Sequence, residues 1–379
     1  FTYILSSIIR GHYYGHQIFN YHFFILSLPK IYSIFIHQET KIRLRKSLDS
    51  IIAQTYEKLE ILLIDDGSTD CSEKICDEYA KKDDRVKVIH KKNEGVAVAR
   101  NSGLRVATGE YCTFVDCDDY IEPVMYQEMM KIADQYDCDV VMCDCVKEFK
   151  EKQVIYTHQI RGGYYDRSQI EEEYFQNLLI MPNVEYPPTI SNCLCVFKRM
   201  LIVENSEKDS LKIHYEEGIR FSEDLLFGAE LLYRANSFYY MKEVCFYHYW
   251  MNPNSVTHTF TVDKWRDYVQ LHGRIKEIFC NCKIYDFSRQ VDLVLLFFVY
   301  NSIGDILSTS MVSMEQKKKI CREILQTGEV KEMFGRLNIW KMPIPFKLKI
   351  LTLIYKYRKG INLLIIRGNR HNEKKGVIY

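Results

Sequence analysis

Three aspartates lie close together directly after a hydrophobic stretch: Asp116, Asp118 and Asp119. The preceding residues, 111–115, are uncharged and mostly β-branched or aromatic, which predicts a buried strand. Residues i and i+2 at the end of a strand point the same way, so Asp116 and Asp118 can address one ligand. Carboxylates this close repel one another and are costly to desolvate, so we expect a hard divalent cation among them. The alternative is a solvated acidic turn, because the D-x-D spacing alone is common.

A second acidic cluster, Asp65-Asp66, begins the turn D-D-G-S-T-D and follows another hydrophobic stretch. The pattern predicts strands over 59–64, 86–89, 111–115 and 139–142. It predicts helices over 43–52, 94–106 and 123–136, and one more that begins at the cap residues 68–70 and runs through Ala80. Such alternation indicates βαβ units and a largely parallel sheet. Ligands bind beyond the carboxyl ends of such strands, where both acidic clusters are expected.

A third acidic pair, Glu223-Asp224, follows Ser222 and opens an apolar helix that runs to about Leu232. Ser222 suits the N-cap, and acids in the first turn of a helix are favoured by the helix dipole. Capping is therefore the simpler interpretation of this pair on local grounds. A role in chemistry needs support from the rest of the chain.

Charge is distributed unevenly along the 379 residues. The net charge is +1, so no global field attracts nucleic acid, and none is expected as a partner. Residues 341–379 hold ten Lys or Arg and one Glu, and residues 346–366 read as a basic amphipathic helix. Such a helix either lies peripherally on an anionic membrane or packs as an ordinary terminal helix.

The 13 cysteines are scattered, and none of their spacings is that of a zinc site, which favours a reduced, cytoplasmic compartment. No run of 18 apolar residues occurs, and the apolar stretch 287–309 is broken by Asp292, Asn301 and Asp305. We therefore expect no membrane-spanning helix.

Four motifs follow one another along the chain: D-D-G-S-T-D at 65–70, N-E-G-V-A-V-A-R-N-S-G at 93–103, F-V-D-C-D-D at 114–119 and S-E-D at 222–224. Their spacing resembles bacterial glycosyltransferase family 2, the inverting GT-A enzymes that build surface polysaccharides. The resemblance runs from about Arg43 to Thr257. It implies an α/β fold of the GT-A, Rossmann-like type, with a mostly parallel sheet, flanking helices and a helical C-terminal region.

The resemblance also implies a domain division. Residues 1–40 form an atypical N-terminal segment, 41–260 a GT-A domain, and 261–379 a helical region with a basic amphipathic end. Within the GT-A domain, 41–145 would be the nucleotide-sugar half and 146–260 the acceptor half.

Residue roles carry over from the family at matching positions. Asp65 and Asp66 resemble the contact to the base and ribose of a nucleotide sugar, most often a UDP-sugar. The stretch that lines the nucleotide pocket is matched by Asn93, Gly95, Arg100 and Asn101. Gly95 lets the backbone approach a ligand, and Arg100 can pair with a phosphate or a carboxylate.

The reaction centre is implied in the same way. Asp116 resembles the ribose-side member of the D-x-D, and Asp118, with Asp116, the ligand of Mn²⁺ or Mg²⁺ that neutralises the diphosphate leaving group. Asp224 resembles the general base that takes the proton of the acceptor hydroxyl. The acceptor would be a glycan, or a lipid-linked glycan at the inner membrane face.

Two positions depart from the family pattern. Relatives begin with a strand ending in P-x-Y-N, where this chain reads Ile36-His37-Gln38-Glu39. Either residues 31–36 form that strand with an altered motif, or the start is not the natural reading frame, and we favour the second because likeness begins abruptly at Arg43. Relatives also often carry Arg where this chain has Trp250, so a cation beside the diphosphate is missing, while His248 and His258 lie nearby in sequence.

Other functions remain open at this stage. A non-catalytic nucleotide-sugar binder, or an inactive fragment, would fit the altered first strand, although Asp65, Asp116, Asp118 and Asp224 are all present. A sugar nucleotidyltransferase would need a Gly-rich, Arg-containing signature on the first strand, which is absent. A purely structural protein does not explain three acidic clusters.

Overall fold

The computed structural model describes residues 23–28, 32–34, 41–187, 192–203, 211–251 and 263–358, with isolated positions 261, 360, 362 and 364. These residues fall into two compact units. The sheet unit takes its described residues from His16–Leu178 and Pro188–Ser255, and the helical unit from Leu179–Pro187 and Val256–Tyr379. The division after residue 255 lies close to the predicted one at 260, but the segment 179–187 joins the helical unit.

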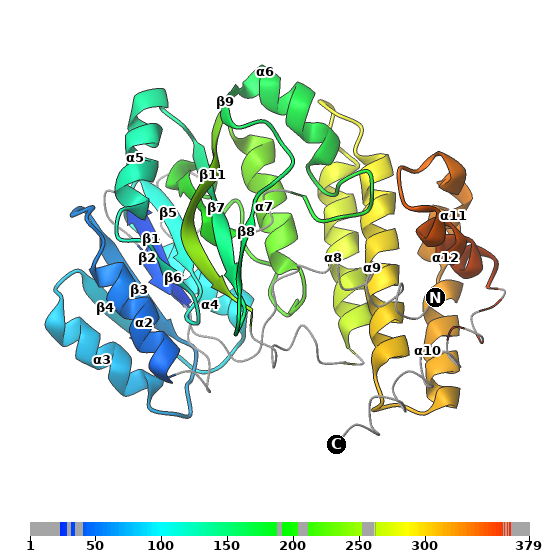
Figure 1. The fold of residues 1–379 in the computed structure, drawn as a ribbon, viewed down its shortest axis with the longest axis horizontal. Helices are drawn as coiled ribbons and strands as arrows, with labels where there is room; N and C mark the ends of the chain where they lie inside the picture. The colour runs from blue at the N-terminus through cyan, green and yellow to red at the C-terminus, as the bar shows by residue number, and fades with distance from the viewer. Residues whose placement is uncertain are drawn as a thin grey trace. The chain divides into compact units, whose positions relative to one another are not determined.

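The strands of the sheet unit form a single sheet within the described residues (Figure 1). They are β1 Phe23–Leu28, β2 Tyr32–Ile34, β3 Glu60–Asp65, β4 Val86–His90, β5 Tyr111–Val115, β6 Tyr120–Ile121, β7 Val140–Glu148, β8 Gln153–Tyr156, β9 Gly163–Asp166, β10 Cys195–Lys198 and β11 Ser237–Trp250. Four of these follow the predicted strands, and β7 is longer than predicted.

The sheet is mixed rather than mostly parallel. Strands β4, β3, β2 and β5 are parallel neighbours, as predicted for βαβ units, and β11 also runs parallel to β7. Strand β10 lies between β5 and β7 and is antiparallel to both, and β1, β6, β8 and β9 also pair antiparallel. The α/β class is therefore confirmed, and the parallel part carries the strand ends with the two acidic clusters.

The N-terminal region contributes β2, which pairs parallel with both β3 and β5. A strand within 31–36 was one of the two explanations for the altered start. The altered motif at 36–39 lies outside the described residues, and so does most of the segment 1–40. The reading-frame explanation stays a prediction.

Helices flank the sheet (Figure 1). The longer ones are α2 Lys41–Ile52, α3 Ser72–Lys82, α4 Val96–Val106, α5 Met125–Tyr136 and α7 Glu223–Arg234, joined by the short α6 Arg167–Gln169, η1 Ile170–Tyr174, η2 Phe175–Asn177, η3 Asn192–Leu194 and η4 Arg199–Leu201. Helix α3 starts later than predicted: its N-cap is Cys71, and Asp70 Oδ1 accepts a hydrogen bond from the Ser72 amide at 2.9 Å.

An aromatic cluster supports the strand that ends in the D-x-D. All five residues of β5 are buried. The Phe114 ring lies 6.0 Å from Phe197 of β10, 5.7 Å from Tyr215 and 6.0 Å from Phe227 of α7. These contacts fix the end of β5 against the helix that begins with Glu223 and Asp224.

The helical unit confirms the predicted C-terminal helical region. It contains α8 Lys264–Phe279, α9 Ser288–Ser308, α10 Met314–Gln326, α11 Gly328–Arg336, η6 Ile339–Lys341 and α12 Phe346–Tyr357. Its centre is α9, whose residues are mostly buried.

Among the described helices, α9 alone is long and apolar enough to cross a membrane, which the sequence analysis did not expect. However, 83% of its apolar window is buried inside the protein. Its acids are also paired: Asp292 with Arg336 at 2.7 Å and Asp305 with Lys264 at 2.6 Å. These features are those of a core helix.

Candidate functional site

The D-x-D-D turn that follows β5 divides its three carboxylates between two tasks. Asp119 is buried; its Oδ2 accepts a hydrogen bond from the Tyr247 hydroxyl at 2.7 Å and its Oδ1 one from the Trp250 amide at 2.8 Å. The Tyr247 oxygen also accepts a bond from the Asp116 amide at 3.1 Å. Asp119 and Tyr247 therefore fasten β11 to the turn, and Asp116 and Asp118 are the half-buried carboxylates that remain for a ligand.

Asp116 and Asp118 fit a divalent cation. Burial and the negative charge of Asp116 raise the pKa of Asp118 to about 7, so a bound positive charge would stabilise both carboxylates. Within the described part of the chain, no group of three or more His, Cys, Asp or Glu could hold a metal ion. Two carboxylates are nevertheless enough for Mg²⁺-type binding, in which substrate phosphates and water supply the other ligands.

A buried guanidinium connects this turn to the S-E-D motif. Arg100 of α4 donates from Nη1 to Glu223 Oε1 at 2.7 Å, and its Nη2 lies 3.6 Å from Asp116 Oδ1. Its Cζ lies 4.7 Å from the centre of the Tyr215 ring. Of the two partners expected for Arg100, phosphate or carboxylate, the structure shows carboxylates.

The Glu223-Asp224 pair begins α7 and is almost fully buried, at 1% and 2% exposure. Ser222 does not make the predicted capping bond, and it has a left-handed backbone with φ of 59°. Burial and the adjacent Glu223 raise the pKa of Asp224 well above its ordinary value. Among the described residues, Asp224 Oδ1 has no hydrogen-bond partner. A buried carboxylate left unsatisfied in this way marks a candidate catalytic group rather than a helix cap.

Asn101, predicted to line the nucleotide pocket, holds the backbone of Tyr215. Its Nδ2 donates to the Tyr215 carbonyl at 2.8 Å, and its Oδ1 accepts from the Tyr215 amide at 2.8 Å. The Tyr215 hydroxyl in turn accepts a bond from Asn192 Nδ2 at 3.0 Å. This gives Asn101 a positioning role at the site, and a contact to nucleotide stays a prediction.

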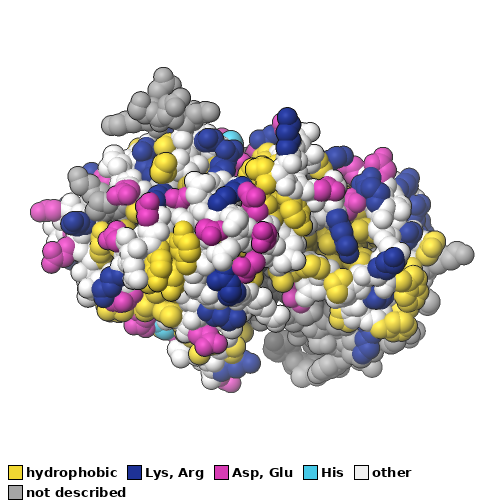
Figure 2. Space-filling view, turned by 90° about the horizontal axis from the view of Figure 1, so that it is seen from above, with side chains coloured by type: hydrophobic (Ala, Val, Ile, Leu, Met, Phe, Trp, Pro, Cys, Tyr) yellow, Lys and Arg dark blue, Asp and Glu magenta, His cyan; other side chains and the backbone are white. Residues whose placement is uncertain are grey.

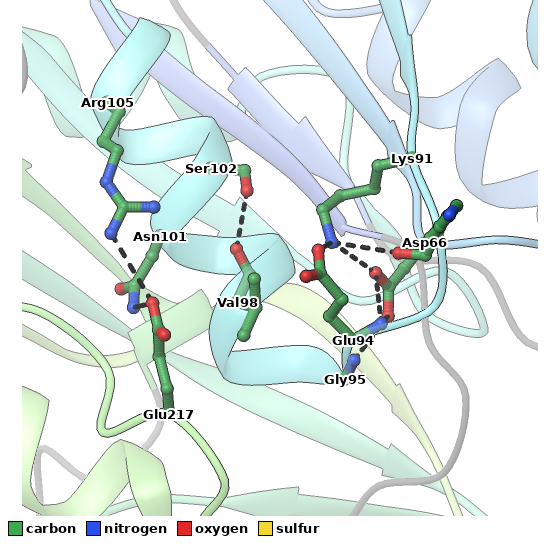
Figure 3. A network of polar contacts seen from close by, with 10 residues as sticks. Asp66, Lys91, Glu94, Gly95, Val98, Asn101, Ser102, Arg105 and Glu217 are labelled. Atoms are coloured by element: carbon green, nitrogen blue, oxygen red, sulfur yellow. Dashed lines mark hydrogen bonds and ion pairs between the residues drawn. The ribbon is translucent and has the colours of Figure 1, made fainter.

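The loop of the second acidic cluster is organised by Asp66 (Figure 3). This fully buried carboxylate accepts bonds from Lys91 Nζ at 2.8 Å, from the Glu94 amide at 3.1 Å and from the Gly95 amide at 2.8 Å. Asp66 thus ties the end of β3 to the loop before α4. Its carboxylate shapes this loop, whatever contact it also makes to a ligand.

Asp65 and Gly67 complete the same loop. Asp65 Oδ1 accepts from the Ser68 amide at 2.9 Å, and its Oδ2 lies 2.7 Å from His90 Nδ1. Gly67 has φ of +79°, and a Cβ there would lie 2.7 Å from the Asn93 amide nitrogen. Only glycine fits this close approach. The side chain of Asn93 is exposed beside the loop.

Sequence reasoning placed the D-x-D and S-E-D aspartates correctly at the ends of a strand and a helix but missed what connects them. The missed residues are Glu223 as the partner of Arg100, Tyr215 and Tyr247. The order of the motifs hinted at Glu223 alone. Tyr215 stands in a stretch with no distinguishing pattern. Tyr247 stands beside His248 and close to Trp250, but only the fold brings its hydroxyl to Asp116 and Asp119.

Comparison with known proteins gives the family. The sequence model described as Glycosyl transferase family 2 matches residues 34–201. This part of the chain is a family 2 glycosyltransferase domain. It contains eight of the nine predicted site residues, and Asp224 follows it in the sequence.

The similar curated proteins are also glycosyltransferases. EpsJ of Bacillus subtilis is 31% identical over 56% of this chain and 59% of its own length, and YibD of Escherichia coli is 32% identical over the same shares. GlyA of Streptococcus pneumoniae is 38% identical over 36% of this chain and 19% of its own length. The matched regions thus span less than two thirds of each of these relatives.

The fold resembles that of TarS from S. aureus. TarS 1–349 aligns with a TM-score of 0.58 and 18% identity over 89% of this chain and 90% of TarS. Its complex with UDP-GlcNAc aligns with a TM-score of 0.60 and 19% identity, over 87% and 88%. At this identity the likeness shows a shared GT-A-like α/β fold with a helical region.

Removing the charge of Arg100 should destabilise the family 2 domain. Arg100→Met leaves Glu223 buried without its partner, and breaking a buried pair in this way costs about 3–5 kcal/mol. Urea unfolding followed by circular dichroism would measure the loss. Arg105→Ala is the matched control, because Arg105 lies on the same helix and pairs with the exposed Glu217 at 3.5 Å. A control loss as large as that of Arg100→Met would contradict a special role for the buried pair.

Proposed function

We propose that the chain is an inverting, metal-assisted hexosyltransferase that uses a nucleotide-diphosphate sugar, with a UDP-sugar as the expected donor. The acceptor is a hydroxyl group of a glycan or a lipid-linked glycan. The observation that carries this proposal is the Arg100 bridge, which links Asp116, inside the region that matches the family 2 model, to the helix that holds Asp224. The binding of UDP-GlcNAc by TarS, on a similar fold, supports a nucleotide-sugar donor.

The donor would lie along the carboxyl ends of β3 and β5. Asp65, Asp66 and Gly95 form the loop beside the base and ribose, and the exposed Asn93 side chain can reach the nucleotide. Asp116 would contact the ribose side. Asp116 and Asp118 would hold Mn²⁺ or Mg²⁺, which when bound supplies positive charge to the diphosphate.

Asp224 would act on the acceptor. The acceptor oxygen forms a bond to the anomeric carbon as the bond from that carbon to the diphosphate oxygen breaks, and the nucleoside diphosphate leaves with the electron pair. The hydroxyl proton passes to the unsatisfied Oδ1 of Asp224. Burial makes the deprotonated form of Asp224 a stronger base than an ordinary aspartate, and Arg100 keeps a positive charge close to it. A single in-line displacement of this kind inverts the anomeric configuration.

The helical unit supports peripheral contact with an anionic membrane through 341–379. Helix α12 has two apolar faces. Leu348, Leu351 and Tyr355 are buried in the unit, whereas Phe346 and Tyr357 are 66% and 63% exposed. The exposed aromatics of this region are Trp340, Phe346 and Tyr357, and the half-buried Ile350, Leu353 and Ile354 continue the second face.

Basic residues accompany this second face. Lys341, Lys347 and Arg358 are exposed. Figure 2 shows hydrophobic side chains beside Lys and Arg side chains at the right of the view, the end at which Figure 1 draws α10–α12. Aromatic and basic residues together fit the headgroup region of anionic lipid, where each Lys or Arg contributes about 1 kcal/mol. The enzyme would then act at the cytoplasmic face of the membrane on a lipid-linked acceptor.

Asp224→Asn should lower turnover at least ~10²-fold, because the amide cannot accept the acceptor proton. Donor binding should persist, since Asp224 faces the acceptor. Release of UDP from the sugar donor measures turnover, and calorimetric titration of UDP with Mn²⁺ measures binding and serves as the folding control. Undiminished turnover would return Asp224 to a structural role.

Asp118→Asn should abolish the dependence of UDP affinity on Mn²⁺. The wild-type chain should bind UDP more tightly with Mn²⁺ than with EDTA, and the variant should bind equally weakly in both. Calorimetry in the two buffers tests this directly. The same gain with Mn²⁺ in the variant and the wild type would exclude Asp118 as a metal ligand.

Exchanging Phe346 and Tyr357 for Ser should reduce binding to vesicles that contain phosphatidylglycerol about tenfold or more, because two large apolar contacts are lost. Co-sedimentation measures the bound fraction, with phosphatidylcholine vesicles as the uncharged comparison. Point variants are preferred to removal of 341–379, because that removal also takes Leu348, Leu351 and Tyr355 out of the unit's core. Met311→Ser is the control, because Met311 is also an exposed apolar residue, at 74%, but does not belong to α12. Equal sedimentation of all forms would contradict membrane contact through this face.

A further inference from the structure

Arg43, near the start of α2, lies on the ring of Trp250. Its Cζ is 3.5 Å from the ring centre, a stacked cation–π contact. The Trp250 amide donates to Asp119 Oδ1 at 2.8 Å, which fixes the end of β11 to the D-x-D-D turn. The indole is therefore anchored at the candidate site and holds the Arg43 guanidinium there. Two segments 207 positions apart in sequence build this arrangement.

The carboxylates around Arg43 differ in whether they accept hydrogen bonds from the protein. The electrostatic neighbours of its guanidinium are Asp118, Asp119 and Glu148. Asp119 is bonded to Tyr247 and Trp250, and Glu148 accepts bonds from Tyr120 and from Gln153. Asp118 is the neighbour left for a ligand. Among the described residues, no ion pair joins Arg43 to a carboxylate, and its guanidinium lies over the Trp250 ring with Asp118 as an electrostatic neighbour.

Two other cations near the acidic clusters are paired with carboxylates. Arg100 is bound to Glu223, and Lys91 to Asp66 and Glu94. Lys46, one turn along α2 from Arg43, lies 3.2 Å above the centre of the Tyr120 ring. Arg43 is thus the guanidinium best placed to meet an anion held beside Asp118.

We propose that Arg43, held in place by Trp250, binds the diphosphate of the nucleotide-sugar donor and stabilises the leaving group. A guanidinium can bind phosphate oxygens through two parallel hydrogen bonds. The contact with the aromatic ring already limits the motion of the Arg43 side chain, so less conformational entropy is lost when phosphate binds. The inference rests on the proposed function, because it assumes a diphosphate donor.

The test is the affinity for UDP in the presence of Mn²⁺. Arg43→Gln removes the charge and should weaken UDP binding about tenfold or more, as for the loss of a charge-assisted hydrogen bond. Binding of uridine, which lacks phosphates, should not change, and this also shows that the variant is folded. Arg45→Gln is the matched control, because Arg45 lies on the same helix and pairs at 2.8 Å with the partly exposed Glu78.

A double variant checks whether the cation itself is what matters. Trp250→Arg added to Arg43→Gln returns a guanidinium to the place where Arg43 and Trp250 meet, and it should restore UDP affinity towards the wild-type value. Failure to restore it would overturn the idea that a cation at this place binds the diphosphate. Unchanged UDP binding by Arg43→Gln would overturn the diphosphate contact while leaving the proposed function intact. A wild-type chain that binds no UDP with Mn²⁺ would instead overturn the proposed function, and this inference with it.

Discussion

The guanidinium of Arg100 is the charge on which the candidate site depends. Three carboxylates from two distant parts of the chain gather here: Asp116 is half-buried, and Glu223 and Asp224 are almost fully buried. Such a group of like charges is unfavourable without a buried cation. Arg100 supplies it from α4 and joins the end of β5 to the first turn of α7. Asn101, the next residue, holds Tyr215 against the same place, so one helix positions both sides of the site.

The acidic motifs serve structure as well as chemistry. Asp66 organises the loop before α4, Asp65 holds the turn at Ser68, and Asp119 fastens β11 to the D-x-D-D turn. Their oxygens are engaged by protein donors, as expected for buried carboxylates. Asp116 and Asp118 remain half-buried, and Asp224 keeps an oxygen with no partner among the described residues. The division between bonded and available carboxylates separates the frame of the site from its reacting parts.

Ser222, at the start of α7, has a strained backbone next to the same site. A left-handed backbone is uncommon for a residue other than glycine, and here it starts the helix that presents Glu223 and Asp224. Such conformations persist where the surroundings impose them, often at functional sites. The contacts of Glu223 with Arg100 and of Asn192 with the Asp224 carbonyl at 3.4 Å are surroundings of that kind.

The sequence by itself determined the α/β class, the helical C-terminal region and the places of four strands with the helices between them, because periodicity and capping act over a few residues. It also identified the aspartates at the strand and helix ends. Only the tertiary structure decided the antiparallel insertion of β10, the burial of α9, the pairing of Arg100 with Glu223 and the stacking of Arg43 on Trp250. These depend on contacts between residues far apart in the chain, which no local pattern records. The sequence does not distinguish an aspartate that accepts hydrogen bonds from the protein from one that is left for a ligand. Its burial and its hydrogen-bond partners in the fold make that distinction.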